Sequence, residues 1–240
     1  MASTGFGFRL PLAALTLLLA AGAPPAAAQR NGLREVHELG SAGLNLVVAD
    51  PVGDFGRHVD VAGGVDAFGA LNLGPGSPIA LRLEGSFLVY GNDNLVVALP
   101  YYPLAITTTY SIATLGIGPQ LTLGSGPMRL YGFGTFGFSY LSASTHYDMG
   151  GCGCGAIATA TYFDDWRPAL RGGGGLRVML GGRHNPVSLD LGASYLHNGS
   201  TWYVAPGGVV PQPNGSVAIY PAHTSADLVI VHLGVSVGIR

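Results

Sequence analysis

Hydrophobic residues recur at every second position in eight separate segments of the chain. Alternation of apolar and polar residues is the pattern of a β-strand whose two faces meet different surroundings. Residues that favour turns, mainly Gly, Pro, Asn and Ser, separate these segments. The predicted strands are residues 38–48, 59–73, 79–90, 107–123, 128–141, 169–180, 187–197 and 225–239.

The predicted connections alternate strictly between short and long. The short ones are residues 74–78, 124–127 and 181–186, and the long ones are 49–58, 91–106, 142–168 and 198–224. Each strand reaches the roughly 9–11 residues that a tilted strand needs to cross a bilayer. An even number of strands with all long loops at one end indicates an antiparallel up-and-down barrel. We expect one such domain over residues 29–240.

Composition supports a membrane location for these strands. The chain of 240 residues is 48% hydrophobic and only 10% charged. After residue 30 it contains no apolar run of about 20 residues that could form a transmembrane helix. Its apolar character is spread over short alternating segments, as in a membrane β-barrel. No basic patch is present, so we expect no nucleic-acid partner.

The first 28 residues have the features of a cleaved export signal. Arg9 provides the positive flank, residues 10–21 are apolar, and three alanines at 26–28 match a cleavage site for small residues. We therefore expect export and a final location in the outer membrane of a diderm bacterium.

The charged residues of the predicted strands lie on the less apolar face. Arg82 and Glu84, for example, share a face opposite Leu81 and Leu83. An Arg facing lipid costs about 2–4 kcal/mol at the membrane midplane, whereas the interior of an eight-stranded barrel is just wide enough for side chains to fill. We therefore predict an ionic network in the lumen, formed by Asp60, Asp66, Arg82, Glu84, Arg171, Arg177, Asp190 and His232.

The short turns also predict which charges meet. A symmetric hairpin centred on residues 181–186 brings Arg177 directly opposite Asp190. The same construction around residues 74–78 brings Arg82 and Glu84 near Asp66. Opposite charges would thus pair inside the barrel.

The segment at residues 130–140, Leu-Tyr-Gly-Phe-Gly-Thr-Phe-Gly-Phe-Ser-Tyr, is similar to the Gly/aromatic strands of small outer-membrane barrels of the OmpA/OmpX type. Together with the export signal and the eight segments, it makes the chain resemble that group. The resemblance implies an all-β, eight-stranded antiparallel up-and-down transmembrane β-barrel. It also implies outer-membrane lipid, lipopolysaccharide and the barrel-insertion machinery as partners. The chain departs from the group at Arg240, where an aromatic residue is typical.

Cys152 and Cys154 lie in the third long connection, flanked by glycines. An oxidising location outside the cell favours a disulfide between them. Metal binding would need further ligands, for which His146 and Asp148 are close in sequence. We expect the disulfide, with no metal and no cofactor.

His197, Ser200 and Asp227 are the candidates for catalysis. A base, a nucleophile and an orienting acid at a strand end would suit a lipid-modifying hydrolase. The simpler interpretation is a polar strand end leading into a turn, and we expect no enzymatic activity. The predicted function is a barrel that displays four long loops, for envelope structure or for binding a surface ligand. Passage of small apolar solutes is the alternative.

Overall fold

The computed structural model describes residues 38–98, 103–124, 126–149, 156–181, 185–211 and 217–239. The predicted export signal and the two cysteines lie outside these ranges. Within the described residues, none of the helical structure is long and apolar enough to cross a membrane.

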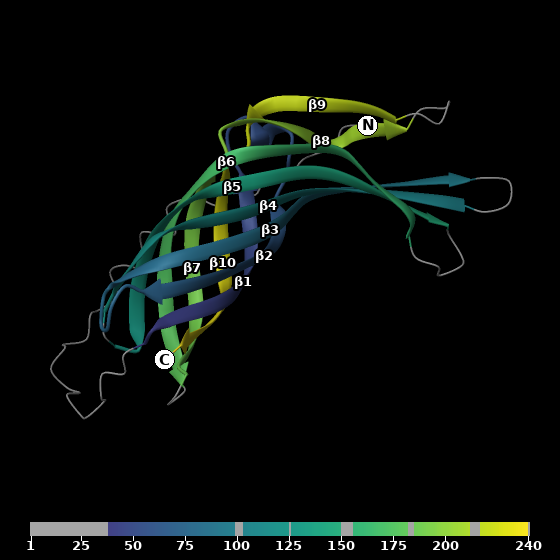
Figure 1. Cartoon of the computed structure of the whole chain (residues 1–240). Helices are drawn as coiled ribbons and strands as arrows, with labels where there is room; N and C mark the ends of the chain where they lie inside the picture. The colour runs from purple at the N-terminus through teal and green to yellow at the C-terminus, as the bar shows by residue number, and fades with distance from the viewer. Residues whose placement is uncertain are drawn as a thin grey trace. The chain divides into compact units, whose positions relative to one another are not determined.

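Eight antiparallel strands are hydrogen-bonded in a closed ring (Figure 1). Each strand pairs with its neighbours in sequence, except that β7 pairs with β10, and β10 closes the barrel by pairing with β1. This arrangement confirms the predicted fold class. The strands are β1 (Gly40–Pro51), β2 (Ala62–Asn72), β3 (Ile79–Ala98), β4 (Pro103–Leu123), β5 (Met128–Met149), β6 (Ala156–Gly181), β7 (Val187–His197) and β10 (Leu228–Ile239).

The short connections gather at one end of the barrel, together with the start of β1 and the end of β10 (Figure 1). Gly76 and Gly124 have φ angles of 70° and 100°, a left-handed conformation that favours glycine. Outer-membrane barrels have short turns on the periplasmic side and longer segments outside the cell. We therefore call this the inner end and the opposite end the outer end.

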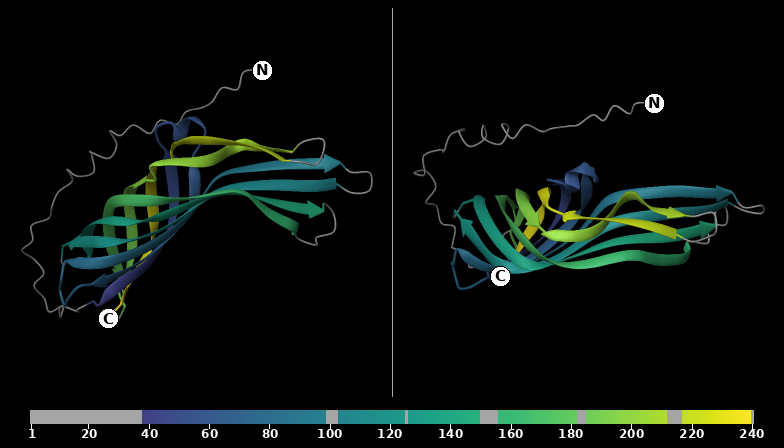
Figure 2. Two further views of the ribbon diagram at one scale, coloured as in Figure 1. Left: turned by 45° about the horizontal axis from the view of Figure 1, so that its top comes forward. Right: turned by 90° about the horizontal axis from the view of Figure 1, so that it is seen from above.

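The prediction that the long connections are loops was wrong for three of the four. β3 and β4 remain paired as far as Ala98 and Pro103, and β5 and β6 as far as Asp148 and Ala156. Because β4 and β5 also pair along this length, the distal parts of β3–β6 form one sheet beyond the barrel (Figure 2). We call this extension, residues 91–98, 103–111, 142–149 and 156–167, the platform.

The last long connection contains a second sheet. β8 (Ser200–Pro211) and β9 (Val217–Ser225) form a two-stranded hairpin that lies over one face of the platform (Figures 1 and 2). A regular alternation is absent here because the pairing is interrupted between Val204 and Val209, and because Trp202 and Tyr220 are apolar residues on the exposed face. Cross-strand hydrogen bonds and packing, rather than alternation, define these elements.

The outer wall of the barrel is apolar on all sides. Leu46, Leu83, Leu115, Phe138 and Val231 come from different strands, and each is at least half exposed. Arg82 and Glu84 of β3 and His232 of β10, in contrast, are buried in the interior. A wall of this polarity is stable in lipid and not in water.

Candidate functional site

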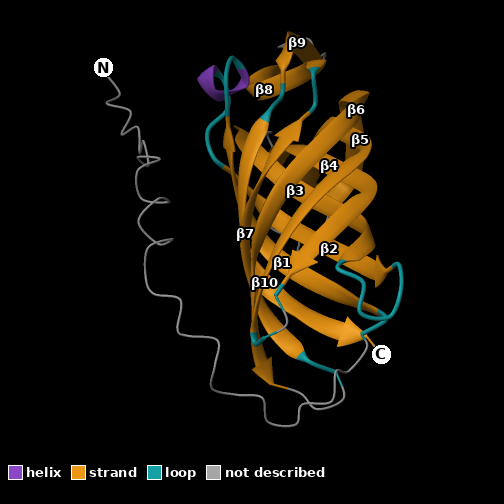
Figure 3. Ribbon diagram, turned by 90° about the vertical axis from the view of Figure 1, so that its left-hand side faces the viewer, coloured by secondary structure: helices purple, strands orange, loops and turns teal. Residues whose placement is uncertain are grey.

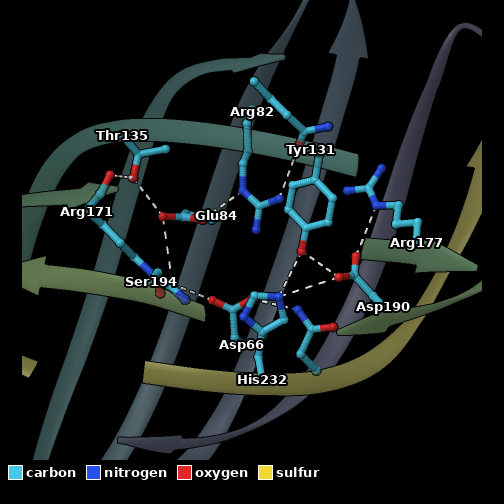
Figure 4. Close-up of polar contacts among 12 residues, drawn as sticks. Asp66, Arg82, Glu84, Tyr131, Thr135, Arg171, Arg177, Asp190, Ser194 and His232 are labelled. Atoms are coloured by element: carbon cyan, nitrogen blue, oxygen red, sulfur yellow. Dashed lines mark hydrogen bonds and ion pairs between the residues drawn. The ribbon is translucent and has the colours of Figure 1, made fainter. Parts of the chain in front are cut away.

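The inner half of the lumen is filled by ion pairs and hydrogen bonds (Figure 4). Arg82 donates from Nε to Glu84 Oε2 at 2.7 Å and from a terminal nitrogen to Gln120 Oε1 at 3.0 Å. The second carboxylate oxygen of Glu84 accepts the Thr135 hydroxyl at 2.6 Å. The arginine and the glutamate belong to β3, while their neutral partners belong to β4 and β5. The contacts therefore tie three strands together across the interior.

Arg171 of β6 reaches across the barrel to Asp66 of β2. A terminal nitrogen of the guanidinium lies 2.5 Å from Asp66 Oδ2, and its Nε donates to Ser194 at 3.0 Å. The same guanidinium lies 3.7 Å from Glu84, and Asn45 donates to the second oxygen of Asp66 at 3.0 Å. Arg171 thus links opposite walls of the barrel and joins the Asp66 and Glu84 carboxylates.

Asp190 of β7 is the centre of a second cluster. Arg177 Nε donates to Oδ2 at 3.0 Å, and the Tyr131 hydroxyl donates to Oδ1 at 2.5 Å. His232 Nε2 lies 2.8 Å from the same hydroxyl and 3.4 Å from Oδ1. Arg177 also reaches Ser41 of β1 at 3.1 Å. This cluster connects β5, β6, β7, β10 and β1.

Aromatic rings separate the guanidinium groups. Arg82 lies between Phe68 and Phe133, 4.1 and 4.2 Å from the ring centroids. Arg177 lies 4.8 Å from Phe68 and 4.6 Å from Tyr131. Cation–π contacts of this kind strengthen when the cation is desolvated. The sequence analysis missed these rings, although each occupies the polar face of its strand and was therefore directed inward.

The inner-half network is balanced in formal charge. Three buried arginines face three buried carboxylates, and each arginine contacts at least one of them. Desolvating a charge is costly unless it is paired and hydrogen-bonded. Each charge has a partner of opposite sign, although the Nη2 atoms of Arg171 and Arg177 have no hydrogen-bond partner among the described residues. Paired, buried side chains therefore fill this half of the lumen.

The outer half of the lumen is instead apolar. Leu88, Ile112, Leu141, Leu228 and Ile230 point inward and are fully buried in one cluster. These positions continue the polar face of the same strands, so the sequence analysis predicted an ionic lumen throughout and did not identify this layer. The outward face is apolar along the whole barrel, whereas the inward face is ionic in the inner half and apolar in the outer half.

Two segments close the apolar layer at the outer end. Phe55, from a short 3₁₀ turn at Phe55–Arg57, is fully buried and packs edge-on against Tyr203 of β8 at 4.8 Å and Tyr90 of β3 at 5.7 Å. The Tyr90 hydroxyl donates to the Val204 carbonyl at 3.1 Å. The β8–β9 hairpin is therefore part of the seal.

The structure places one predicted network residue elsewhere. Asp60 precedes β2 and is exposed, so its assignment to the lumen was wrong. The apolar residue next to it, Val59, is buried in the apolar cluster at the outer end of the lumen. The two residues therefore belong to the connection before β2, which begins only at Ala62. A separate pair, Arg129 with Glu38 at 2.9 Å, lies at the inner end.

The three candidates for catalysis do not form one hydrogen-bonded group. His197 Nδ1 lies 3.0 Å from Asp227 Oδ1, whereas Ser200 Oγ lies 3.2 Å from His223 Nε2. Asp227 also accepts the Tyr195 hydroxyl at 2.9 Å and the Asn198 amide at 3.1 Å. A hydrolytic triad needs the base within hydrogen-bond reach of the nucleophile, and the hydrogen bonds of Ser200 run to a different histidine.

Potential metal ligands are scattered in the part of the chain that the structure describes. No three residues among its His, Cys, Asp and Glu approach closely enough to hold a metal ion. The carboxylates of the network are occupied by arginine, tyrosine, threonine and asparagine.

A closed antiparallel barrel with an apolar wall, short turns at one end and buried ion pairs is an outer-membrane β-barrel. The chain is similar to three solved structures of this class. Neisserial surface protein A is 12% identical over 85% of this chain and 99% of its own, with a TM-score of 0.44. Ail, the attachment invasion locus protein of Yersinia pestis, solved with the heparin analogue sucrose octasulfate, is 10% identical over 82% of this chain and 97% of its own, with a TM-score of 0.40.

A major outer membrane protein from Thermus thermophilus is 14% identical over 81% of this chain and 98% of its own, with a TM-score of 0.40. No protein-family model matches the sequence. No curated protein matches it significantly either.

Proposed function

We propose that the protein is a sealed membrane anchor that displays the platform and the β8–β9 hairpin as a binding surface outside the cell. The observation that carries this proposal is the continuity of β3–β6, which cross the membrane and then continue as one sheet (Figure 2). Display of an ordered sheet requires a rigid base, and the packed lumen provides one.

The filled lumen argues against the passage of small apolar solutes. The inner half is occupied by paired charges, which would reject an apolar molecule. The outer half is apolar but is closed by Phe55 and Tyr203. A solute would have to displace both layers.

The separated pairs at the end of β7 support a non-enzymatic role. Ser200 lacks a hydrogen bond to His197 in the described structure, and His197 is held by Asp227. We therefore assign these residues to anchoring the strand end.

The charges of the platform do not favour the ligand seen with Ail. Among the described residues of the platform and the β8–β9 hairpin, Arg167 is the single Arg or Lys, whereas Asp93, Asp148, Asp164 and Asp165 are acidic. A polysulfated saccharide requires positive charge. The platform is better suited to a neutral or cationic surface ligand.

Conductance and accessibility test the proposal together. Refolded wild-type protein should give no steady ion channels in planar bilayers. In a background with both cysteines replaced by serine, T159C on the platform should react with a membrane-impermeant maleimide on intact cells. G126C, in the inner turn between β4 and β5, should react only after the cells are broken. Steady channels, or the opposite labelling pattern, would contradict a sealed display anchor.

A further inference from the structure

A shallow groove on the outer wall of the barrel is lined by residues of β4, β5, β6 and β7. These four strands are consecutive neighbours in the barrel, whose ribbon is drawn in Figure 3. The floor of the groove includes Gly134 of β5 and Gly172 of β6, which are paired across the two strands. A Cβ placed on Gly134 would meet no atom within 4 Å. The groove has a volume of about 430 Å³, within the roughly 300–1,000 Å³ of typical ligand pockets. Outward-facing glycines thus leave a hollow in an otherwise continuous apolar wall.

Large side chains form the walls of the groove. Ile117, Phe136 and Leu170 lie in one row across β4, β5 and β6, on the side nearer the outer end. Pro119 of β4 and Tyr195 of β7 flank the glycine pair. These walls are almost entirely apolar, so they match a hydrocarbon chain rather than a polar ligand.

Toward the inner end, large side chains fill the outer wall again. Leu130 of β5, Leu176 of β6 and Leu191 of β7 are paired in a single row. The hollow therefore lies between this leucine row at its inner limit and the row of Ile117, Phe136 and Leu170 at its outer limit.

A second hollow of about 300 Å³ lies on the outer-end side of that row and shares Phe136, Leu170 and His197 with the first. An acyl chain that lies across this row occupies both hollows, which together are called the groove below. The other lining residues of the second hollow include Arg167 and Ser200. The exposed polar groups of the groove are thus concentrated on the side nearer the outer end.

A histidine and an arginine at this rim are each held in place by a carboxylate. His197 is 51% exposed and contacts Asp227 through Nδ1, which leaves Nε2 for a ligand. Arg167 is one-third exposed and contacts Asp165 through Nε, which leaves its terminal nitrogens. The guanidinium of Arg167 donates well to phosphate oxygens, and Nε2 of a neutral His197 accepts a sugar hydroxyl.

We propose that this groove binds one acyl chain of an outer-leaflet glycolipid, whose phosphorylated sugar headgroup contacts His197 and Arg167. The groove is continuous with the lipid-facing wall, so its occupant comes from the membrane. Its apolar part faces the hydrocarbon region and its polar part faces the headgroups, which is the polarity of a single lipid molecule. The site does not depend on the display of the platform, so either proposal can fail without the other.

Native mass spectrometry of the full chain, purified in mild detergent and supplied with lipid A, tests the site. Wild-type protein should retain one lipid A molecule. Leucine at the groove floor, in G134L and G172L, should lower the retained fraction at least about tenfold, because excluding two methylene groups from burial already has that effect. H197A should weaken retention of lipid A but not of phosphatidylethanolamine with similar chains.

G69L is the matched control. Gly69 is also an outward-facing glycine, and a Cβ there meets no atom within 4 Å, but it lies on β2, away from the groove. A heat-sensitive shift on SDS gels will show that every variant is folded. The proposal is overturned if wild-type protein retains no lipid A, or if G134L and G172L retain as much as G69L. Equal retention of phosphatidylethanolamine by wild-type protein, or a dimer that G134L dissociates, would also overturn it.

Discussion

Arg177 and Asp190 lie directly opposite each other on β6 and β7, and Arg177 Nε is 3.0 Å from Asp190 Oδ2. Asp190 is fully buried and also accepts the Tyr131 hydroxyl. One carboxylate thus organises a cluster that reaches five strands. The closed barrel makes such a cluster possible because side chains from distant strands meet at its axis.

Replacing Asp190 by alanine should destabilise the barrel by about 3–5 kcal/mol, because Arg177 and His232 would lose their buried partner. Equilibrium unfolding by urea in lipid vesicles measures this change. D164A, at an exposed position of β6, is the control and should have little effect. The double variant D190L/R177M should recover part of the lost stability, because it removes Arg177 together with its carboxylate partner. Equal stability of D190A and D164A would exclude a structural role for the cluster.

The close approach of β4 and β5 at Gly137 gives a second prediction. A Cβ at this position would overlap the carbonyl oxygen of Leu115, so G137A should lower the unfolding free energy by about 1–3 kcal/mol through overpacking. G69A makes the same chemical change in open space and should be neutral. A G137A variant as stable as G69A would show that the two strands are farther apart than described.

Acid should loosen the β8–β9 hairpin through Asp165. This residue lies beyond Trp166, outside the membrane-crossing part of β6, and accepts hydrogen bonds from Thr201 Oγ1 and the Trp202 amide. Partial burial raises the pKa of Asp165, but the hydrogen bonds from Arg167, Trp202 and Thr201 outweigh burial and hold the pKa below its usual range.

Because the folded pKa is lowered, the stabilisation is present above the ordinary aspartate pKa of about 3.9 and is lost as the pH falls through the folded value. Limited proteolysis of the hairpin should therefore be faster at a pH below the folded pKa of Asp165 than at neutral pH. D165N should be cleaved faster at neutral pH and should show a flatter pH dependence. Identical pH profiles for D165N and wild-type protein would refute the assignment.

The polarity of the barrel can be tested at Leu83, which is half exposed on the outer wall and adjacent in sequence to buried Arg82. L83R should cost about 2–4 kcal/mol if the side chain faces the middle of the bilayer. V96R places the same charge on the exposed platform and should cost far less. Unfolding of both variants in lipid vesicles gives the comparison. Similar stabilities would place Leu83 outside the membrane.

Much of the fold could be predicted because a membrane strand has two strongly different faces. Leu83 and Arg82 differ in polarity at adjacent positions, and this contrast identifies both the strand and its orientation. The short turn after β6 similarly places Arg177 opposite Asp190, since antiparallel pairing in a tight hairpin follows from the turn position.

The platform could not be predicted in the same way. Ser144, Thr145 and His146 are consecutive polar residues of β5, and they hide the period of the strand. Thr145 is nevertheless buried and bonded to Thr108 of β4 at 2.8 Å. A polar residue can occupy a covered position when a hydroxyl on the next strand satisfies it, and no local pattern reveals that partner.

The sequence by itself determined the number of barrel strands, their antiparallel order and which face of each meets lipid, because these depend on local alternation and turn chemistry. Only the tertiary structure decided that Arg171 pairs with Asp66 across the barrel, that an apolar layer seals the outer half of the lumen, and that glycines of β5 and β6 align into a groove. These features arise from contacts between residues far apart in the chain, and their distances follow from closure of the barrel rather than from any neighbouring residue.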